Sequence, residues 1–255
     1  IHVRTRSRER SNSEGVSMPT GCLRNQGIVL LLVLLLAASL LPSPGQAGAS
    51  GRAYEGIEFT DVTNESGFGA ISPGGTTEWA AYGPGVAWGD YDGDGDLDAY
   101  VTARFDHLGF ESGTFTTGRT YLMQNSASPN YTFAEVSDEA GVGLVNSTAI
   151  GASWADYDND GDLDLYIGNE SNQAFTGVPN QLFQNDGAGA FVDVAREAGV
   201  EDYGPTKAVG FGDYDADGRP DLYVSNLGGP NRLYHNNGDG TFTDVAARVG
   251  VTGPD

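Results

Sequence analysis

The stretch Asp90-Tyr-Asp-Gly-Asp-Gly-Asp-Leu-Asp98 decides the fold, because it occurs three times in the chain. It returns as Asp156-Tyr-Asp-Asn-Asp-Gly-Asp-Leu-Asp164 and as Asp213-Tyr-Asp-Ala-Asp-Gly-Arg-Pro-Asp221. Five carboxylates within nine residues repel one another strongly unless a cation lies among them, and Ca²⁺ takes hard oxygen ligands from alternate positions of such loops. The three stretches are therefore predicted to be calcium-binding loops, holding about three Ca²⁺ ions in all.

The three copies also indicate which atoms would bind the ion. Position 7 of the loop is Asp96, Asp162 or Arg219. Because an arginine side chain cannot coordinate a cation, position 7 is predicted to bind through its backbone carbonyl, and the glycine at position 6 permits the tight turn that this requires. Positions 1, 3, 5 and 9 are Asp in every copy and are the predicted side-chain ligands: Asp90, Asp92, Asp94 and Asp98, then Asp156, Asp158, Asp160 and Asp164, then Asp213, Asp215, Asp217 and Asp221.

An EF-hand is the first alternative, since its loop begins in the same way. It requires a bidentate Glu at position 12 and a helix on each side. Position 12 is Val101, Ile167 and Val224, and the flanking residues are short β-branched and aromatic runs typical of strands. Aromatic strands at fixed offsets also disfavour a disordered acidic tract. Each loop is therefore predicted to join two strands.

Each loop lies inside a longer repeat whose first Asp recurs after 66 and then 57 residues. An aromatic residue stands two positions before the loop, a strand containing Tyr follows it, a third strand ends in Asn, and a fourth begins with Phe. Four strands form one blade of a β-propeller, and the small residues before each loop suit first strands that converge on the propeller axis. The fold class predicted is an all-β propeller with blades at about 80–138, 147–196 and 205–247.

The sequence pattern of this unit resembles the FG-GAP or VCBS repeat, the calcium-binding propeller blade also found in integrin α-subunits. Three motifs of the unit are most similar to those of cartilage acidic protein and ASPIC/UnbV-type proteins. They are Phe242-Thr-Asp-Val, Gly212-Asp-Tyr-Asp-Ala-Asp-Gly and Asn231-Arg-Leu-Tyr-His-Asn-Asn-Gly-Asp-Gly-Thr-Phe. The resemblance covers residues 57–251 and implies the same Asp ligands. Pro220 replaces the usual Leu without affecting them.

Composition restricts the possible partners. The 255 residues include 38 Gly and carry a formal net charge of -22, which excludes nucleic acid and an anionic membrane surface as obvious partners. Fourteen of the acids lie in the three loops, so bound Ca²⁺ would neutralise much of this charge. Cys22 is the one cysteine, which leaves metal ions rather than disulfides to stabilise the loops.

The chain begins with features of an export signal. Residues 28–41 form an apolar run that suits a signal peptide better than a membrane span, and Ala47-Gly-Ala49 matches a cleavage site. Residues 18–49 are predicted to be the signal peptide, the mature chain to begin at Ser50, and residues 1–17 to be an upstream artefact or disordered. The expected location is secreted, cell surface or periplasm; an uncleaved leader would be the one route to a membrane.

The functional prediction is a binding or adhesion scaffold rather than an enzyme. His107 and His235 follow the leader, but neither accompanies a motif that activates a nucleophile. The variable connection 102–120 carries Phe105, His107, Phe110 and Phe115, which could anchor an extracellular protein or glycan of unknown identity. The alternative is the non-catalytic propeller part of a secreted hydrolase or lyase.

The first strand of the predicted domain, residues 57–63, has no blade of its own. Phe59-Thr-Asp-Val62 matches the fourth strands, so it is expected to be a closing strand beside about three blades, whereas closed propellers have typically four to eight. The prediction is an open arc with exposed apolar end faces, and residues 50–255 alone are expected to associate.

Overall fold

The computed structural model describes residues 2–5, 57–71, 85–102, 118–126, 131–170 and 178–253, and divides into two compact units, Ile1–Asp61 and Val62–Asp255. In the first unit, β1 (His2–Thr5) pairs antiparallel with β2 (Ile57–Thr60). β2 lies inside the predicted closing strand, and β1 is its partner. The signal peptide, its cleavage site and the aromatic residues at 105–115 lie outside the described residues.

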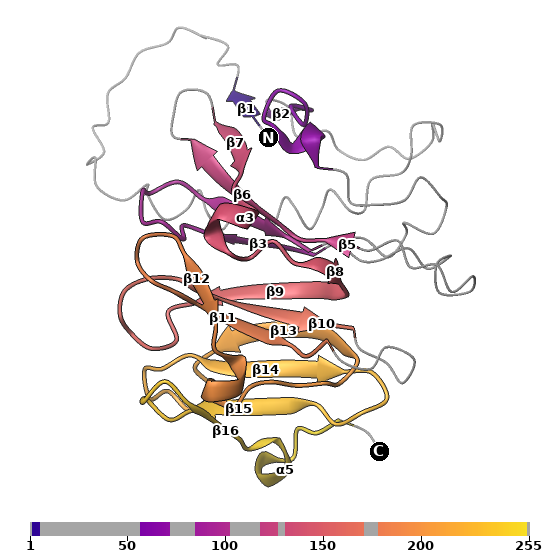
Figure 1. Ribbon diagram of the computed structural model, residues 1–255, viewed down its shortest axis with the longest axis vertical. Coiled ribbons are helices and arrows are strands. Elements are labelled where there is room, and N and C mark those ends of the chain that lie inside the picture. Colours follow the sequence, from indigo (N-terminus) through magenta and orange to yellow (C-terminus); the bar gives the residue numbers. More distant parts are fainter. Residues whose placement is uncertain are drawn as a thin grey trace, which may run out of the picture. The chain divides into compact units, whose positions relative to one another are not determined.

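The second unit contains three four-stranded antiparallel sheets, which confirms the predicted all-β fold (Figure 1). Each sheet keeps its strands in sequence order, as a propeller blade does. The first sheet consists of β3 (Val86–Gly89), β4 (Asp98–Val101), β6 (Tyr121–Ser126) and β7 (Thr132–Glu135). The second consists of β9 (Ala149–Ala155), β10 (Asp164–Asn169), β11 (Gln181–Asn185) and β12 (Phe191–Asp193). The third consists of β13 (Thr206–Gly212), β14 (Asp221–Asn226), β15 (Arg232–Asn236) and β16 (Phe242–Asp244).

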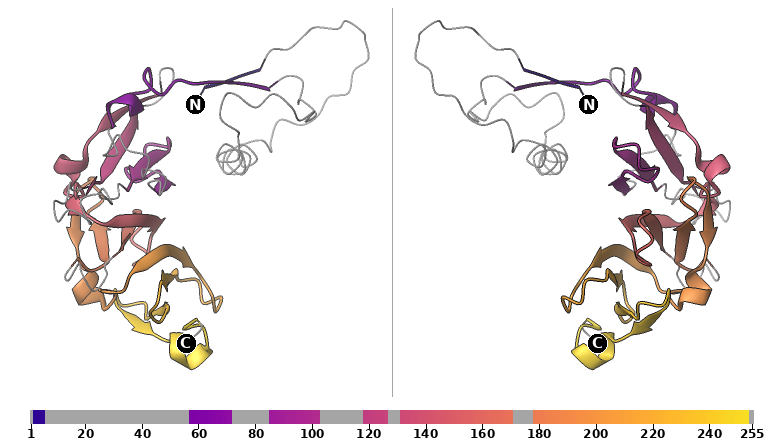
Figure 2. Two further views of the ribbon diagram at one scale, coloured as in Figure 1. Left: turned by 90° about the vertical axis from the view of Figure 1, so that its right-hand side faces the viewer. Right: turned by 90° about the vertical axis from the view of Figure 1, so that its left-hand side faces the viewer.

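Within the second unit the sheets follow one another as an open, propeller-like series (Figure 2). β3 packs on β9, and β9 in turn packs on β13. One apolar core joins the first and second sheets, and a second core joins the second and third. Small residues permit the close approach that was predicted: a Cβ on Gly89 would lie 2.9 Å from the Trp154 ring of the next sheet. Trp154 also donates its indole N–H to the Ala87 carbonyl across this interface, at 3.2 Å.

Short helices after the fourth strands were not predicted from the sequence. They are α3 (Ser137–Ala140), α4 (Ala195–Ala198) and α5 (Ala246–Val249), and η1 (Phe68–Ala70) is a 3-10 turn. Each α-helix ends at a glycine with φ near +80°, Gly141, Gly199 or Gly250, because a residue without Cβ adopts the left-handed cap at little cost. Helices of three or four residues are all that the described segments contain, and none is long and apolar enough to cross a bilayer. Between the first two sheets, β5 (Gly118–Arg119) pairs with β8 (Val145–Ser147).

Tyr166→Phe tests how much a buried hydrogen bond of this core contributes to the free energy of unfolding. The Tyr166 side chain is fully buried and donates its hydroxyl to the Val200 carbonyl at 2.8 Å. Removing the donor leaves a buried carbonyl unpaired, so the free energy of unfolding should fall by about 1–3 kcal/mol. Tyr223 holds the same repeat position but is 38% exposed, so Tyr223→Phe is the matched control and should change stability by less than about 0.5 kcal/mol. Urea denaturation measures both; equal effects would contradict the assignment.

Candidate metal centres

Each acidic loop connects the first and second strands of its sheet. The last residue before the loop pairs with position 9 in all three: Gly89 with Asp98, Ala155 with Asp164, and Gly212 with Asp221. The flanks are strands, which confirms the prediction against an EF-hand. Position 6 has the expected positive φ, and position 4 adopts it as well, at Gly93, Asn159 and Ala216. Two residues in the left-handed backbone conformation let the nine-residue loop fold into a compact turn, in which successive polar groups point toward the inside of the loop.

Backbone N–H groups hold the carboxylates of positions 1 and 5 in the same way in every loop. The position 1 carboxylate accepts from the N–H of position 6, for example Gly161 to Asp156 at 3.1 Å. The position 5 carboxylate accepts from the N–H of position 7, for example Asp162 to Asp160 at 3.0 Å. These contacts recur in the first and third loops. The loop backbone therefore fixes two of the predicted ligands in place before any ion binds.

Position 9 is the buried carboxylate of each loop. Asp164 accepts from the Tyr157 N–H at 3.1 Å and from the Asn185 N–H of the third strand at 2.9 Å. Asp98 and Asp221 make the same pair of contacts. Burial raises the pKa of Asp98 to about 7 and that of Asp164 to about 7; the backbone N–H donors oppose this shift, and other loop carboxylates add to it. A nearby cation would favour the ionised form of both groups.

Position 3 has a partner that the sequence reasoning missed. Gln124 donates its side-chain N–H to Asp92, and Gln184 donates to Asp158, each at 2.6 Å. In the third loop this place belongs to His235, whose Nδ1 lies 3.4 Å from an Asp215 oxygen and 3.2 Å from an Asp221 oxygen. All three partners directly precede the Asn at or next to the end of the third strand, and this shared offset was the signal available in the sequence.

The fold brings together most, though not all, of the predicted ligands. Three groups offer one oxygen each within 4.8 Å of one another: Asp90, Asp92 and Asp94; Asp156, Asp158 and Asp164; and Asp213, Asp215 and Asp217. Asp215 and Asp221 also form such a group with His235. Asp98 and Asp160 stand outside these groups, as do the side chains of position 7.

The carboxylate chemistry fits a hard cation such as Ca²⁺. In the part of the chain that the structure describes, one oxygen of Asp90 and one of Asp158 are buried without a hydrogen-bond partner. A buried, unpaired carboxylate oxygen is costly, and a bound ion would satisfy it. Asp90, Asp92 and Asp94 would hold an ion in the first loop, Asp156, Asp158 and Asp164 in the second, and Asp213, Asp215 and Asp217 in the third.

The third loop differs from the others in its local charge. Arg219 at position 7 donates to the Asp217 side chain and, through Nε, to the Asn236 carbonyl at 3.2 Å. The guanidinium therefore competes with an ion for the position 5 carboxylate. A third site would have a lower affinity than the first two for this reason.

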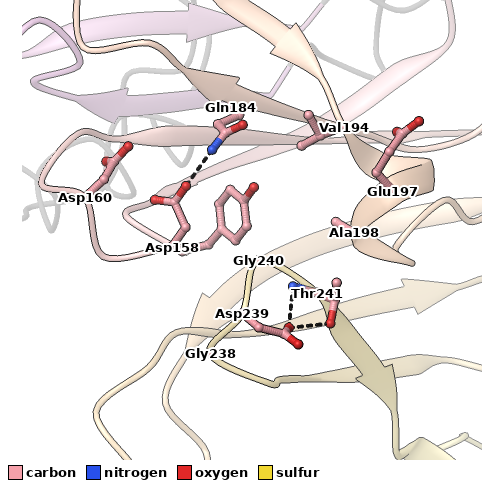
Figure 3. A pocket seen from close by; sticks show the side chains of 11 residues that line it. Asp158, Asp160, Gln184, Val194, Glu197, Ala198, Gly238, Asp239, Gly240 and Thr241 are labelled. Carbon is pink, nitrogen blue, oxygen red and sulfur yellow. Dashed lines mark hydrogen bonds between the residues drawn. The ribbon is translucent and has the colours of Figure 1, made fainter.

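A shallow pocket opens beside the second loop, between the second and third sheets (Figure 3). Asp158 and Asp160 come from the loop, and Asp239 lies across from them in the turn between β15 and β16. Figure 3 shows Gln184 pointing at Asp158, and Asp239 turned toward Thr241. This acidic pocket is the side from which solvent reaches Asp158 of the second candidate metal centre.

Comparison with known proteins agrees with the geometry. The FG-GAP-like repeat family matches residues 156–224 and 213–255. Human cartilage acidic protein 1 is 34% identical over 182 residues, 67% of this chain and 26% of its own length. The mouse protein is 33% identical over 182 residues, 67% of this chain and 27% of its own, and that of Xenopus tropicalis is 38% identical over 89 residues, 33% of this chain and 13% of its own. The chain thus spans about a quarter of the human and mouse relatives.

Proposed function

Because this chain is an FG-GAP-like repeat protein related to cartilage acidic protein 1, we propose that it is a calcium-binding scaffold that acts outside the cell. Each of the three loops would hold one Ca²⁺. The ions would rigidify the turns that join the first two strands of every blade, and the connections between strands would then bind an extracellular protein or glycan.

One observation supports calcium binding above all others. The same positions of three loops carry carboxylates that the backbone already holds, and clusters of three oxygens converge within 4.8 Å. Such convergence of like charges is unfavourable without a cation. Because these carboxylates would be held ionised by the ion, they are poorly suited to general-acid catalysis, which favours a binding scaffold over a hydrolase or lyase.

The apolar run of residues 28–41 and the small residues Ala47-Gly-Ala49 support export to the cell surface, the periplasm or the medium. N-terminal sequencing of exported protein should give Ser50 or a near neighbour. A retained leader would contradict cleavage and would indicate an anchor instead.

Calorimetric titration and array binding test the two parts of the proposal separately. Titration with Ca²⁺ should give about three ions per chain, with no comparable heat from Mg²⁺ at the same concentration. Arrays of extracellular proteins and glycans, probed in Ca²⁺ and in EGTA, should show binding that requires Ca²⁺. Hydrolysis or elimination of an array glycan would support the enzyme alternative, whereas absence of bound Ca²⁺ would contradict the metal centres themselves.

Arg219→Ala tests the role of position 7. The third ion should remain, because the backbone carbonyl is unaffected by the side chain. Its affinity should rise by up to about fivefold, since an exposed ion pair to Asp217 is worth up to about 1 kcal/mol. Arg232→Ala is the matched control, because its ion pair with Asp244 lies outside the loop. Loss of one ion from the Arg219→Ala titration would show that position 7 does not bind through its carbonyl.

A further inference from the structure

A histidine takes the place of a glutamine beside the third acidic loop. Gln124 and Gln184 each donate a side-chain N–H to the position 3 carboxylate of their own loop, at 2.6 Å. His235 stands at the same place on β15, and its Nδ1 lies 3.4 Å from an Asp215 oxygen and 3.2 Å from an Asp221 oxygen. The amide N–H of a glutamine is only a donor, whereas a neutral imidazole nitrogen binds metal ions. The third loop therefore has a nitrogen ligand where the other two loops have a donor.

The Nδ1 atom of His235 is buried, and within the part of the chain that the structure describes it makes no hydrogen bond. Both carboxylate oxygens are close to this atom, yet neither accepts a hydrogen bond from it. A buried ring nitrogen without a partner is costly, and a metal ion between it and the two oxygens would supply the partner. The side chains of His235 and Asp215 are 24% and 34% exposed, so an ion from solvent can reach the group.

The three candidate ligand atoms have the spacing expected around one small metal ion. One atom each of Asp215, Asp221 and His235 lies within 4.8 Å of the others. Zn²⁺ binds nitrogen and carboxylate oxygen at about 2.0–2.2 Å in a tetrahedron, which places neighbouring ligand atoms about 3.3–3.6 Å apart. The distances of 3.2 and 3.4 Å from Nδ1 to the two oxygens are close to this spacing. Three protein ligands would leave the fourth position of the tetrahedron for water.

Neighbouring groups hold two of these ligands in place. Asp221 is 1% exposed, and its two oxygens accept from the backbone N–H groups of Tyr214 and Asn236, at 3.0 and 2.8 Å. The His235 ring meets the Tyr214 ring edge to face, with centroids 6.0 Å apart. Partners that orient the ligands of a metal ion increase its affinity.

Arg219 favours this group over the group of three carboxylates in the same loop. The guanidinium donates to the side chain of Asp217, which belongs to the carboxylate group together with Asp213 and Asp215. Asp215 belongs to both groups, so an ion bound to His235 removes a ligand from the carboxylate group. Imidazole nitrogen suits Zn²⁺, whereas Ca²⁺ takes oxygen ligands. The third loop is thus weakened as a calcium centre and equipped for a different class of ion.

We propose that Asp215, Asp221 and His235 form a binding site for Zn²⁺. The third loop then differs from the first two in the class of metal ion that it takes, because those loops have glutamine in place of His235. This inference goes beyond the proposed function and does not require that any loop bind Ca²⁺.

Titration of the full chain with Zn²⁺, in the absence of Ca²⁺, tests the site. His235→Gln is the matched variant, because it restores the side chain that the first two loops have. Its Zn²⁺ affinity should be at least about tenfold lower than that of the wild type, since loss of even an outer partner of a ligand costs that much. An unchanged melting temperature without metal shows that the variant folds.

Gln184→His makes the reverse change in the second loop. It places an imidazole beside Asp158, in the loop where Asp164 corresponds to Asp221. The variant should bind one more Zn²⁺ per chain than the wild type, with an affinity similar to that of the third loop. If it gains no ion, the proposal is wrong, because the same three ligand types would then be insufficient.

Nitrogen NMR of protein with isotope-labelled histidine identifies the ligand atom. The chain has three histidines, and the signals of His235 are those that the His235→Gln variant lacks. Zn²⁺ should shift the Nδ1 signal of His235 and saturate at one equivalent. A signal that does not move, or equal Zn²⁺ affinity in the wild type and the His235→Gln variant, would overturn the proposal.

These outcomes are distinguishable from those of the calcium titration. Zn²⁺ bound at His235 in a chain that binds no Ca²⁺ would support this site and contradict the proposed calcium centres. Three bound Ca²⁺ ions with no Zn²⁺ at His235 would support the calcium centres and refute this site.

Discussion

Ca²⁺ should raise the free energy of unfolding by about 2.7 kcal/mol for each occupied site when its concentration is a hundredfold above Kd. An ion that binds the folded loops would have no comparable site in the unfolded chain, so its binding free energy would add to the folding free energy. For a chain of this size the melting temperature should rise by roughly 5–11 °C per site. Thermal melts in EGTA and in Ca²⁺ measure the difference, and Mg²⁺ at the same concentration should produce a much smaller shift.

Asp158→Ala assigns part of this effect to the second loop. Asp158 has a buried oxygen without a partner, and it belongs to the group that converges with Asp156 and Asp164. The variant should lose the contribution of that site in Ca²⁺, yet in EGTA it should be about as stable as the wild type because the repulsion is relieved. Glu139→Ala removes an exposed acid from α3 and should keep the full calcium response. An Asp158→Ala protein that melts lower in EGTA by the same amount would show a purely structural role.

Calcium binding should release about two protons per chain near pH 6 and almost none near pH 8.5, because Asp98 and Asp164 have a pKa of about 7. Near pH 6 both carboxyls are largely protonated in the calcium-free protein, and the ion favours their ionised forms. Calcium affinity should therefore increase with pH through about 7. Titration calorimetry in two buffers of different ionisation enthalpy counts the protons.

The same shifts determine how stability depends on pH without calcium. An unfolded Asp titrates near about 3.9, so between about pH 4 and pH 7 the folded protein binds more protons than the unfolded chain. Its stability should fall as pH rises through this window, and Ca²⁺ should reverse the trend. Asp164→Asn should remove about one of the released protons, whereas Glu139→Gln should remove none. Equal release at pH 6 and pH 8.5 would contradict the assignment of these groups.

The local chemistry of the repeat was readable from the sequence alone. Alternating Asp residues and the glycine at position 6 identified the loops, and Arg219 at position 7 predicts which positions would bind an ion through side chains and which through the backbone. Aromatic residues at fixed offsets identified the strands that flank Asp90 and Asp98, and the structure has strands there. The turns and strands were predictable because they depend on residues within one turn or one strand of each other, where spacing along the chain determines position in space. The assignment of Ca²⁺ ligands within the loops stays a prediction.

Tertiary structure alone decided how the loops are held. Asn185 donates to the Tyr91 carbonyl 94 residues away, and Gln184 reaches Asp158 from a strand 26 residues later. The short helices that end at Gly141 and Gly199 are also placed by tertiary structure, because both glycines lie against the next sheet. Whether a polar side chain meets such a partner depends on how two sheets pack, and spacing along the chain carries little information about that. The burial that raises the pKa of Asp164 also comes from tertiary structure, because the strands that exclude water from this carboxylate are distant from it in the sequence.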